Sequence, residues 1–179
     1  MFDDRISKDA RRGNPDRGRN HFMRSDALQE RGAAGDREKA LADLDEFVRL
    51  NPRHGAGFVR RAVFREFLGH IEQAMADFDE AIKVEPTLSD GHCGRGALCS
   101  RSGKVDQALA DLSQALLLQP TDPAARISRG DVWKQKGEIE KAISDYNDVI
   151  RTWPLLSSGY AHRGVAGTGR TGQGVSRFQ

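Results

Sequence analysis

Apolar side chains recur at helical spacing along the middle of the chain. The clearest run starts at Ile71 and has apolar residues at offsets 0, 3, 4, 7, 10 and 11. Matching runs start at Val105 and at Ile139. This spacing puts the apolar side chains on one stripe of a helix of about fourteen residues. The stretch before each run, such as residues 58–68, contains no proline and predicts a helix of its own.

The same residue types return every 34 positions. Four columns follow this period: Pro52, Pro86, Pro120 and Pro154; Gly35, Gly69, Gly103 and Gly137; Ala40, Ala74, Ala108 and Ala142; Asp43, Asp77, Asp111 and Asp145. A fixed period of this length is typical of a repeat protein. We predict repeats 1 to 4 at residues 21–54, 55–88, 89–122 and 123–156, followed by a partial fifth repeat at 157–166.

Each repeat predicts two antiparallel helices. Its glycine, such as Gly69, suits the left-handed turn that ends the first helix, and its proline stops the second. Asp122 and Pro123 stand where an N-cap and a first helical residue are expected. Small residues such as Ala62 would let the paired helices approach closely. One pair cannot bury its apolar stripe alone, so we expect the pairs to stack into an all-α solenoid.

This repeat pattern resembles the tetratricopeptide repeat (TPR) family. The family has small residues at positions eight and twenty of each repeat, a large apolar or aromatic residue at position twenty-four and proline at position thirty-two. Repeat 4 matches with Gly130, Ala142, Tyr146 and Pro154, whereas repeat 1 departs with Leu28 at the first small position. The resemblance covers residues 21–166. It implies a TPR superhelix with a concave groove.

The resemblance also implies where a partner would bind. In the family, the first helix of each repeat lines the groove, and the groove holds a peptide or protein segment. Carried onto this chain, that role falls to Val59, Arg60, Val63, Glu66, Asp90, Cys93, Ala97, Ile127, Asp131 and Lys134. Family members that hold the terminal carboxylate of heat-shock chaperones use Lys and Asn in the groove, and of the matching positions here only Arg60 can bind a carboxylate. The implied function is that of a non-enzymatic scaffold or adaptor without a chaperone-tail clamp.

The near-neutral total of 28 basic and 26 acidic side chains hides an uneven distribution. Residues 1–20 have six basic and four acidic side chains, and residues 157–179 have three arginines and no acid. The first segment has few apolar residues, and the last has four glycines between 167 and 174. We therefore predict a disordered basic arm at 1–20 and a loose glycine-rich tail at 167–179.

Alternatives to an adaptor stay open at this point. The basic ends offer contacts to nucleic-acid phosphates, but acidic residues dilute them and few aromatic residues accompany them, which argues against binding of single strands. The chain could also be a TPR module of a larger protein. The partial fifth repeat is either a short frayed cap, a truncated or altered end, or a surface that a partner completes, which includes end-to-end association of two copies.

No pattern of residues predicts catalysis, a cofactor or a metal. The glycines at 167–174 lack the GK[ST] ending and the following helix of a phosphate-binding loop. His92, Cys93 and Cys99 would not converge as zinc ligands on one helix. No apolar run approaches the roughly 20 residues that a membrane helix needs. We expect a non-enzymatic protein with no membrane span, and its two cysteines favour the cytoplasm.

An arginine column accompanies the aspartate column. Its members Arg61, Arg95, Arg129 and Arg163 are also 34 residues apart. We predict that they form ion pairs with the aspartates, in preference to a row of ligand-binding arginines. As surface pairs they would each contribute only about 0 to 1 kcal/mol, so their main effect would be to set the register of the stack.

Overall fold

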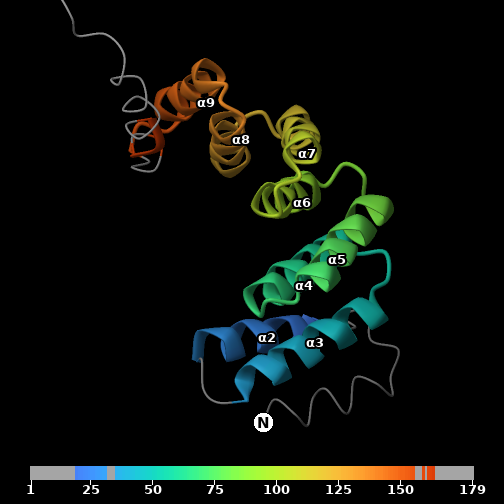
Figure 1. Cartoon of the computed structure of the whole chain (residues 1–179). Coiled ribbons are helices and arrows are strands. Elements are labelled where there is room, and N and C mark those ends of the chain that lie inside the picture. Colours follow the sequence, from blue (N-terminus) through green and yellow to red (C-terminus); the bar gives the residue numbers. More distant parts are fainter. Residues whose placement is uncertain (1–18, 32–34, 156–158, 160, 164–179) are drawn as a thin grey trace, which may run out of the picture. The chain divides into compact units, whose positions relative to one another are not determined.

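The computed structural model describes residues 19–31, 35–155, 159 and 161–163, and the regular elements that they form are all α-helices (Figure 1). The helices are α2 (Arg19–Arg31), α3 (Asp36–Leu50), α4 (Gly55–Phe67), α5 (Ile71–Val84), α6 (Ser89–Arg101), α7 (Val105–Leu118), α8 (Pro123–Gln135) and α9 (Ile139–Thr152). The chain divides into an N-terminal half, residues 1–91, and a C-terminal half, residues 92–179. Helices α2 to α5 lie in the first half. Helix α6 from His92 onward lies in the second, together with α7 to α9.

The helices follow the 34-residue period. The first helix of a repeat, here called the A helix, begins at Gly55, Ser89 and Pro123 in repeats 2 to 4. The second, the B helix, begins at Ile71, Val105 and Ile139, where the apolar runs begin. The predicted all-α architecture of helix pairs is confirmed. In repeat 1 the A helix begins at Arg19, although the sequence predicted an unstructured arm as far as residue 20.

The rest of the predicted arm, residues 1–18, and the predicted tail at 167–179 lie outside the described residues. In the partial fifth repeat, the described residues 159 and 161–163 are helical.

The turn between the A and B helices has one geometry in repeats 2 to 4. Its glycine is left-handed, with φ of 81° at Gly69, 74° at Gly103 and 84° at Gly137. After α4, the amide of His70 donates to the carbonyl of Arg65 at 2.8 Å, and the amide of Gly69 donates to that of Glu66 at 2.9 Å. These two bonds define a Schellman motif, which satisfies carbonyls at the end of the helix. The prediction of left-handed glycines is confirmed.

Two A helices have a side-chain N-cap. Asp122 accepts the amide of Ala124 at 2.8 Å, with Pro123 as the first helical residue, which confirms the predicted start of α8. At the start of α4, His54 Nδ1 accepts the amide of Gly57 at 3.0 Å. A histidine nitrogen can accept only when it carries no proton, so this cap requires the neutral ring.

The A and B helices of a repeat cross where one of them has almost no side chain. The alanines Ala40, Ala74, Ala108 and Ala142 of the B helices are fully buried. On the A helices, a Cβ atom at Gly96 would lie 2.8 Å from Leu112, and one at Gly130 would lie 2.5 Å from the ring of Tyr146. Contacts this short leave no room for a methyl group. The small-residue columns therefore exist because the helices touch.

Replacing Gly130 by alanine should destabilise the protein by about 1 to 3 kcal/mol, because the new methyl group overlaps the Tyr146 ring. At an exposed helical position the same change would stabilise the protein by about 1 kcal/mol, because alanine has a higher helix propensity than glycine. Here the steric overlap outweighs that gain. Urea unfolding followed by circular dichroism measures it. The control Gln135→Ala, at an exposed position of the same helix, should stay within about 0.5 kcal/mol. An unchanged or raised midpoint for Gly130→Ala would contradict the close crossing.

Candidate functional site

An arginine from the A helix pairs with an aspartate from the B helix in repeats 2, 3 and 4. The shortest nitrogen–oxygen distances are 2.6 Å for Arg61 and Asp77, 2.6 Å for Arg95 and Asp111, and 2.7 Å for Arg129 and Asp145. Each arginine donates through Nε and one terminal nitrogen, so each pair is bidentate. The predicted ladder is confirmed for these three arginines.

The ladder differs from the prediction in its burial. The carboxylates are only 3 to 5% exposed at Asp77, Asp111 and Asp145, so these are not surface pairs. A buried carboxylate without its cation leaves an uncompensated charge, which costs far more than the loss of an exposed pair. Hydrogen bonds to Asp145 also hold the pKa of Arg129 above its ordinary value, although burial opposes this. The ladder therefore stabilises each repeat as well as setting its register.

Repeat 1 satisfies the same requirement with other residues. Its arginine position is occupied by Ala27, yet Asp43 is buried like the other aspartates. Arg24, one helical turn earlier, forms a bidentate pair with Asp43, and His21 Nδ1 lies 2.8 Å from the same carboxylate. At the other end, Arg163 contacts Asn147 at 3.4 Å.

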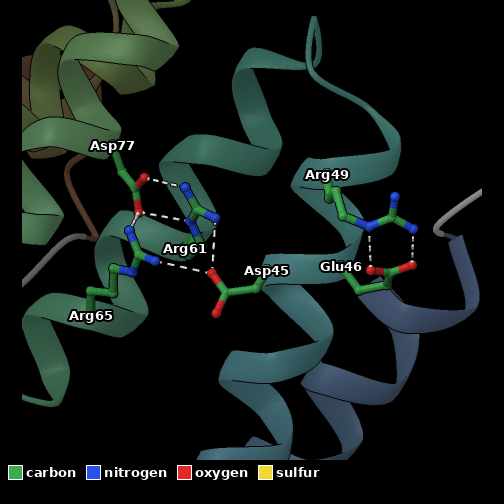
Figure 2. A network of polar contacts seen from close by, with 6 residues as sticks. All are labelled: Asp45, Glu46, Arg49, Arg61, Arg65 and Asp77. Atoms are coloured by element: carbon green, nitrogen blue, oxygen red, sulfur yellow. Dashed lines mark hydrogen bonds and ion pairs between the residues drawn. The ribbon is translucent and has the colours of Figure 1, made fainter.

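In the N-terminal half the ladder widens into a network that joins three helices (Figure 2). Arg61 and Arg65 of α4 both donate to Asp77 of α5, and both also donate to Asp45 of α3, at 2.9 and 3.0 Å. The Glu46–Arg49 pair in the same view differs from this network, because it joins two residues of α3 and is exposed to solvent. The network therefore fixes the rotation of α4 about its own axis.

Removing the central carboxylate of this network should strongly lower the free energy of unfolding. Asp77→Ala leaves Arg61 and Arg65, which are 15 and 16% exposed, with only the half-exposed Asp45, so we expect a loss of about 3 kcal/mol or more in urea unfolding. Glu46→Ala, which breaks the exposed pair beside it, is the matched control and should cost less than about 1 kcal/mol. Similar losses from the two variants would show that the network contributes no more than a surface pair.

Four of the predicted groove residues lie on α4, on the side opposite Arg61 and Arg65. At 100° per residue, Val59, Val63 and Glu66 fall on one stripe of the helix, with Arg60 at its edge. Val63 is 53% exposed, whereas Val59 is half-buried and packs against the core cluster of Phe47, Val48, Phe58 and Ala81. Burial lowers the pKa of Arg60. Val63 therefore exposes an apolar side chain to solvent, and Val59 belongs largely to the core.

Phe67 is not among the predicted groove residues, yet it continues this stripe one turn after Val63. Its ring is 65% exposed and stacks on that of Phe64, with centroids 6.1 Å apart. The guanidinium carbon of Arg37, at the start of α3, lies 5.2 Å from the ring centroid of Phe67. Repeats 3 and 4 have Arg101 and Gln135 at this position, so a comparison of the columns would have revealed the aromatic residue. We call Arg37, Val63 and Phe67 the α4 edge.

The other predicted groove residues have mixed surroundings. Asp90 is exposed and belongs to the N-terminal half. In the C-terminal half, Cys93 packs against Ala115, Leu116 and Ala125, while Ala97, Ile127 and Lys134 are half-buried. The role of these residues in binding stays a prediction.

Asp131, another predicted groove residue, already serves as an acceptor within the protein. Its Oδ1 accepts the hydroxyl of Tyr146 at 2.8 Å and lies 2.9 Å from Nδ1 of His162, and the Lys134 ammonium is 4.0 Å away. Burial and the bond to Asp131 raise the pKa of Tyr146, so this hydroxyl stays a donor. Asp131 thereby links α8, α9 and the described helical residues after α9.

The described residues offer no other clear chemical centre. None of their His, Cys, Asp and Glu side chains gather in a group of three that could hold a metal ion. Nor is any helix in the described part of the chain long and apolar enough to cross a membrane.

These features define a class: a helical-repeat protein whose A helices are fixed by buried ion pairs and expose one face. Two models of the tetratricopeptide repeat family match the chain, at residues 58–88 and 100–156. This chain is a tetratricopeptide repeat protein, as its repeat columns indicated. No curated protein sequence matches it.

Solved structures share the fold at low sequence identity. The TPR protein TTC0263 from Thermus thermophilus is 22% identical, with a TM-score of 0.72 over 93% of this chain and 91% of that one. YrrB, a TPR protein with an unusual peptide-binding site, is 18% identical, with a TM-score of 0.69 over 94% of this chain and 82% of that one. The first TPR of Spaghetti (RPAP3), bound to an HSP90 peptide, is 16% identical, with a TM-score of 0.62 over 65% and 93%.

Proposed function

We propose that this protein is a non-enzymatic interaction module that binds a peptide or protein segment on the exposed face of its A helices. The observation that carries the proposal is the two-sided construction of α4. One side is locked to α3 and α5 by the Arg61 and Arg65 network, and the other side leaves Val63 and Phe67 more than half exposed. A rigid helix that presents apolar side chains to solvent is a surface suited to partner binding.

The structural neighbours support a peptide ligand in general terms. YrrB has a peptide-binding site, and the Spaghetti domain is bound to an HSP90 peptide. We do not propose an HSP90 peptide as the ligand of this chain. The positions that match the chaperone-tail clamp have no Lys or Asn, and one of them, Ser25, is fully buried.

The polar side chains of the described residues favour a binding role over a catalytic one. The buried aspartates of the ladder are all engaged by arginines, and Asp131 is engaged by Tyr146 and His162. Carboxylates held in this way serve the architecture of the repeat. We therefore assign the activity of the protein to recognition of a partner.

Val63→Glu should abolish capture of the natural partner, because it places a charge at the centre of the exposed apolar stripe. Affinity pulldown from the source lysate with the full chain, compared with the variant, measures this. Val59→Glu is a poorer test, since Val59 packs against the core and its variant could unfold. Ala76→Glu, at an exposed position of the B helix α5, adds the same charge elsewhere and should leave capture intact.

Two outcomes would contradict the proposal. One is a partner retained equally by wild type and folded Val63→Glu. The other is capture that survives Val63→Glu but disappears when residues 1–20 are deleted and falls steeply with salt, which would identify nucleic-acid binding through the basic arm.

A further inference from the structure

The α4 edge combines an exposed ring with a cation that is held above it. Phe64 supports Phe67 from the core, where it is only 4% exposed and packs with Ala40 and Leu44. Arg37 is exposed and its guanidinium carbon is 5.2 Å from the centroid of the Phe67 ring. Phe67 is therefore oriented by its contact with the core before any partner arrives, which lowers the entropy lost on binding, and Arg37 lies within cation–π distance of it.

Arg37 has no acidic partner among the side chains that the structure describes, whereas Arg31 of the neighbouring α2 is paired with Asp36. A cation–π contact uses the charge of the guanidinium and none of its N–H donors. Those donors remain available to a carboxylate from outside. The edge thus offers apolar area and an anion-binding group side by side.

Both residues depart from the repeat pattern. The position of Arg37 holds Ile71, Val105 and Ile139 in the other repeats, and the position of Phe67 holds Arg101 and Gln135. In repeats 3 and 4 the apolar members Val105 and Ile139 are half-buried, and the polar Gln135 faces solvent. At the α4 edge the residue types are exchanged: the charged Arg37 stands at the usually apolar position, and the apolar Phe67 stands at the usually polar, exposed position. Packing within the array gives no reason for this exchange, because it leaves the Phe67 ring 65% exposed.

We propose that the α4 edge binds a segment of a partner protein that carries a large aliphatic or aromatic side chain next to an aspartate or glutamate. The apolar side chain packs against Val63 and the free edge of Phe67, and the side-chain carboxylate accepts N–H groups of Arg37. Arg60, two turns before Phe67 on α4, adds a second positive charge on this side of the helix. The inference rests on the proposed function and specifies the chemistry of its ligand.

A nucleic acid fits this surface less well. Stacking of a base requires an open ring face. Phe64 and Arg37 both contact Phe67 through its faces, so they leave no open face on which a base could stack. An aliphatic side chain, in contrast, needs only the ring edge and the Val63 methyl groups. The covered faces and open edge of the ring therefore favour a protein segment with an apolar side chain.

The test uses the full chain and a phage-displayed library of random 12-residue peptides. We expect enriched sequences to have Leu, Ile, Met or Phe within two residues of Asp or Glu. A selected peptide is then synthesised with an amidated C-terminus, so that only side-chain carboxylates remain, and labelled for fluorescence anisotropy. Its Asp→Asn or Glu→Gln analogue should bind at least tenfold more weakly.

Two variants introduce residues that other repeats of the chain have at the corresponding positions, so the fold should tolerate them. Arg37→Ile should weaken binding of the acidic peptide at least tenfold and leave binding of its Asn or Gln analogue unchanged. Phe67→Arg should abolish binding of both. Lys39→Ile removes an exposed cation from the same helix as Arg37 and should change neither affinity by more than about twofold.

Several results would overturn the inference: no enriched peptide, enrichment of basic or uncharged sequences, equal binding of acid and amide peptides, or indifference to Arg37→Ile. Tighter binding of a labelled oligothymidine than of any peptide, sensitive to Phe67→Arg, would assign the edge to nucleic acid. If the natural partner is lost with Val63→Glu but kept with Arg37→Ile, the proposed function holds and this inference fails.

Discussion

The buried carboxylate of each B helix is the constraint on which the rest of the repeat depends. An aspartate that is 1 to 5% exposed cannot keep its charge in the interior without a cation at hydrogen-bond distance. The cation comes from the facing A helix, at a fixed interval of 16 residues in Arg61–Asp77, Arg95–Asp111 and Arg129–Asp145. A bidentate bond permits little rotation of either partner. The pair thereby sets the angle at which the A helix presents its other side.

Steric and electrostatic requirements act together at this interface. Gly96 and Gly130 let the A helix approach until Leu112 and Tyr146 fill the space, and this proximity brings the arginine within reach of its aspartate. Repeat 1 shows that the buried carboxylate is paired with a cation even where the usual arginine is replaced. Where the arginine position holds Ala27, Arg24 and His21 meet Asp43 from an earlier turn of the helix. The physical demand is conserved between repeats even though the position is not.

The exposed face of an A helix is free of these demands and can vary. On α4, Arg61 and Arg65 occupy the side that is bonded to α3 and α5, whereas on the opposite side Val59 packs against the core and Val63 does not. Val63 and Phe67 are apolar there without being buried. Arg37 and Phe67, which both depart from the repeat columns, meet at the α4 edge. The backbone of this surface follows the repeat pattern, whereas its side chains do not. A rigid backbone with side chains of its own is what the proposed recognition site needs.

The sequence by itself determined the fold. Helical periodicity, the 34-residue columns and the glycine and proline positions are local signals. They predicted the starts of α5, α7, α8 and α9, the left-handed turns at Gly69, Gly103 and Gly137, and the Arg–Asp partnership. Burial could not be predicted in the same way, because it depends on what neighbouring helices cover. The tertiary structure decided that Asp77 is a core residue, that Val59 and Cys93 pack inward, and that Asp131 is engaged by Tyr146 and His162. It also brought Arg37 over Phe67, thirty residues apart in sequence, because their contact depends on how α3 packs against α4.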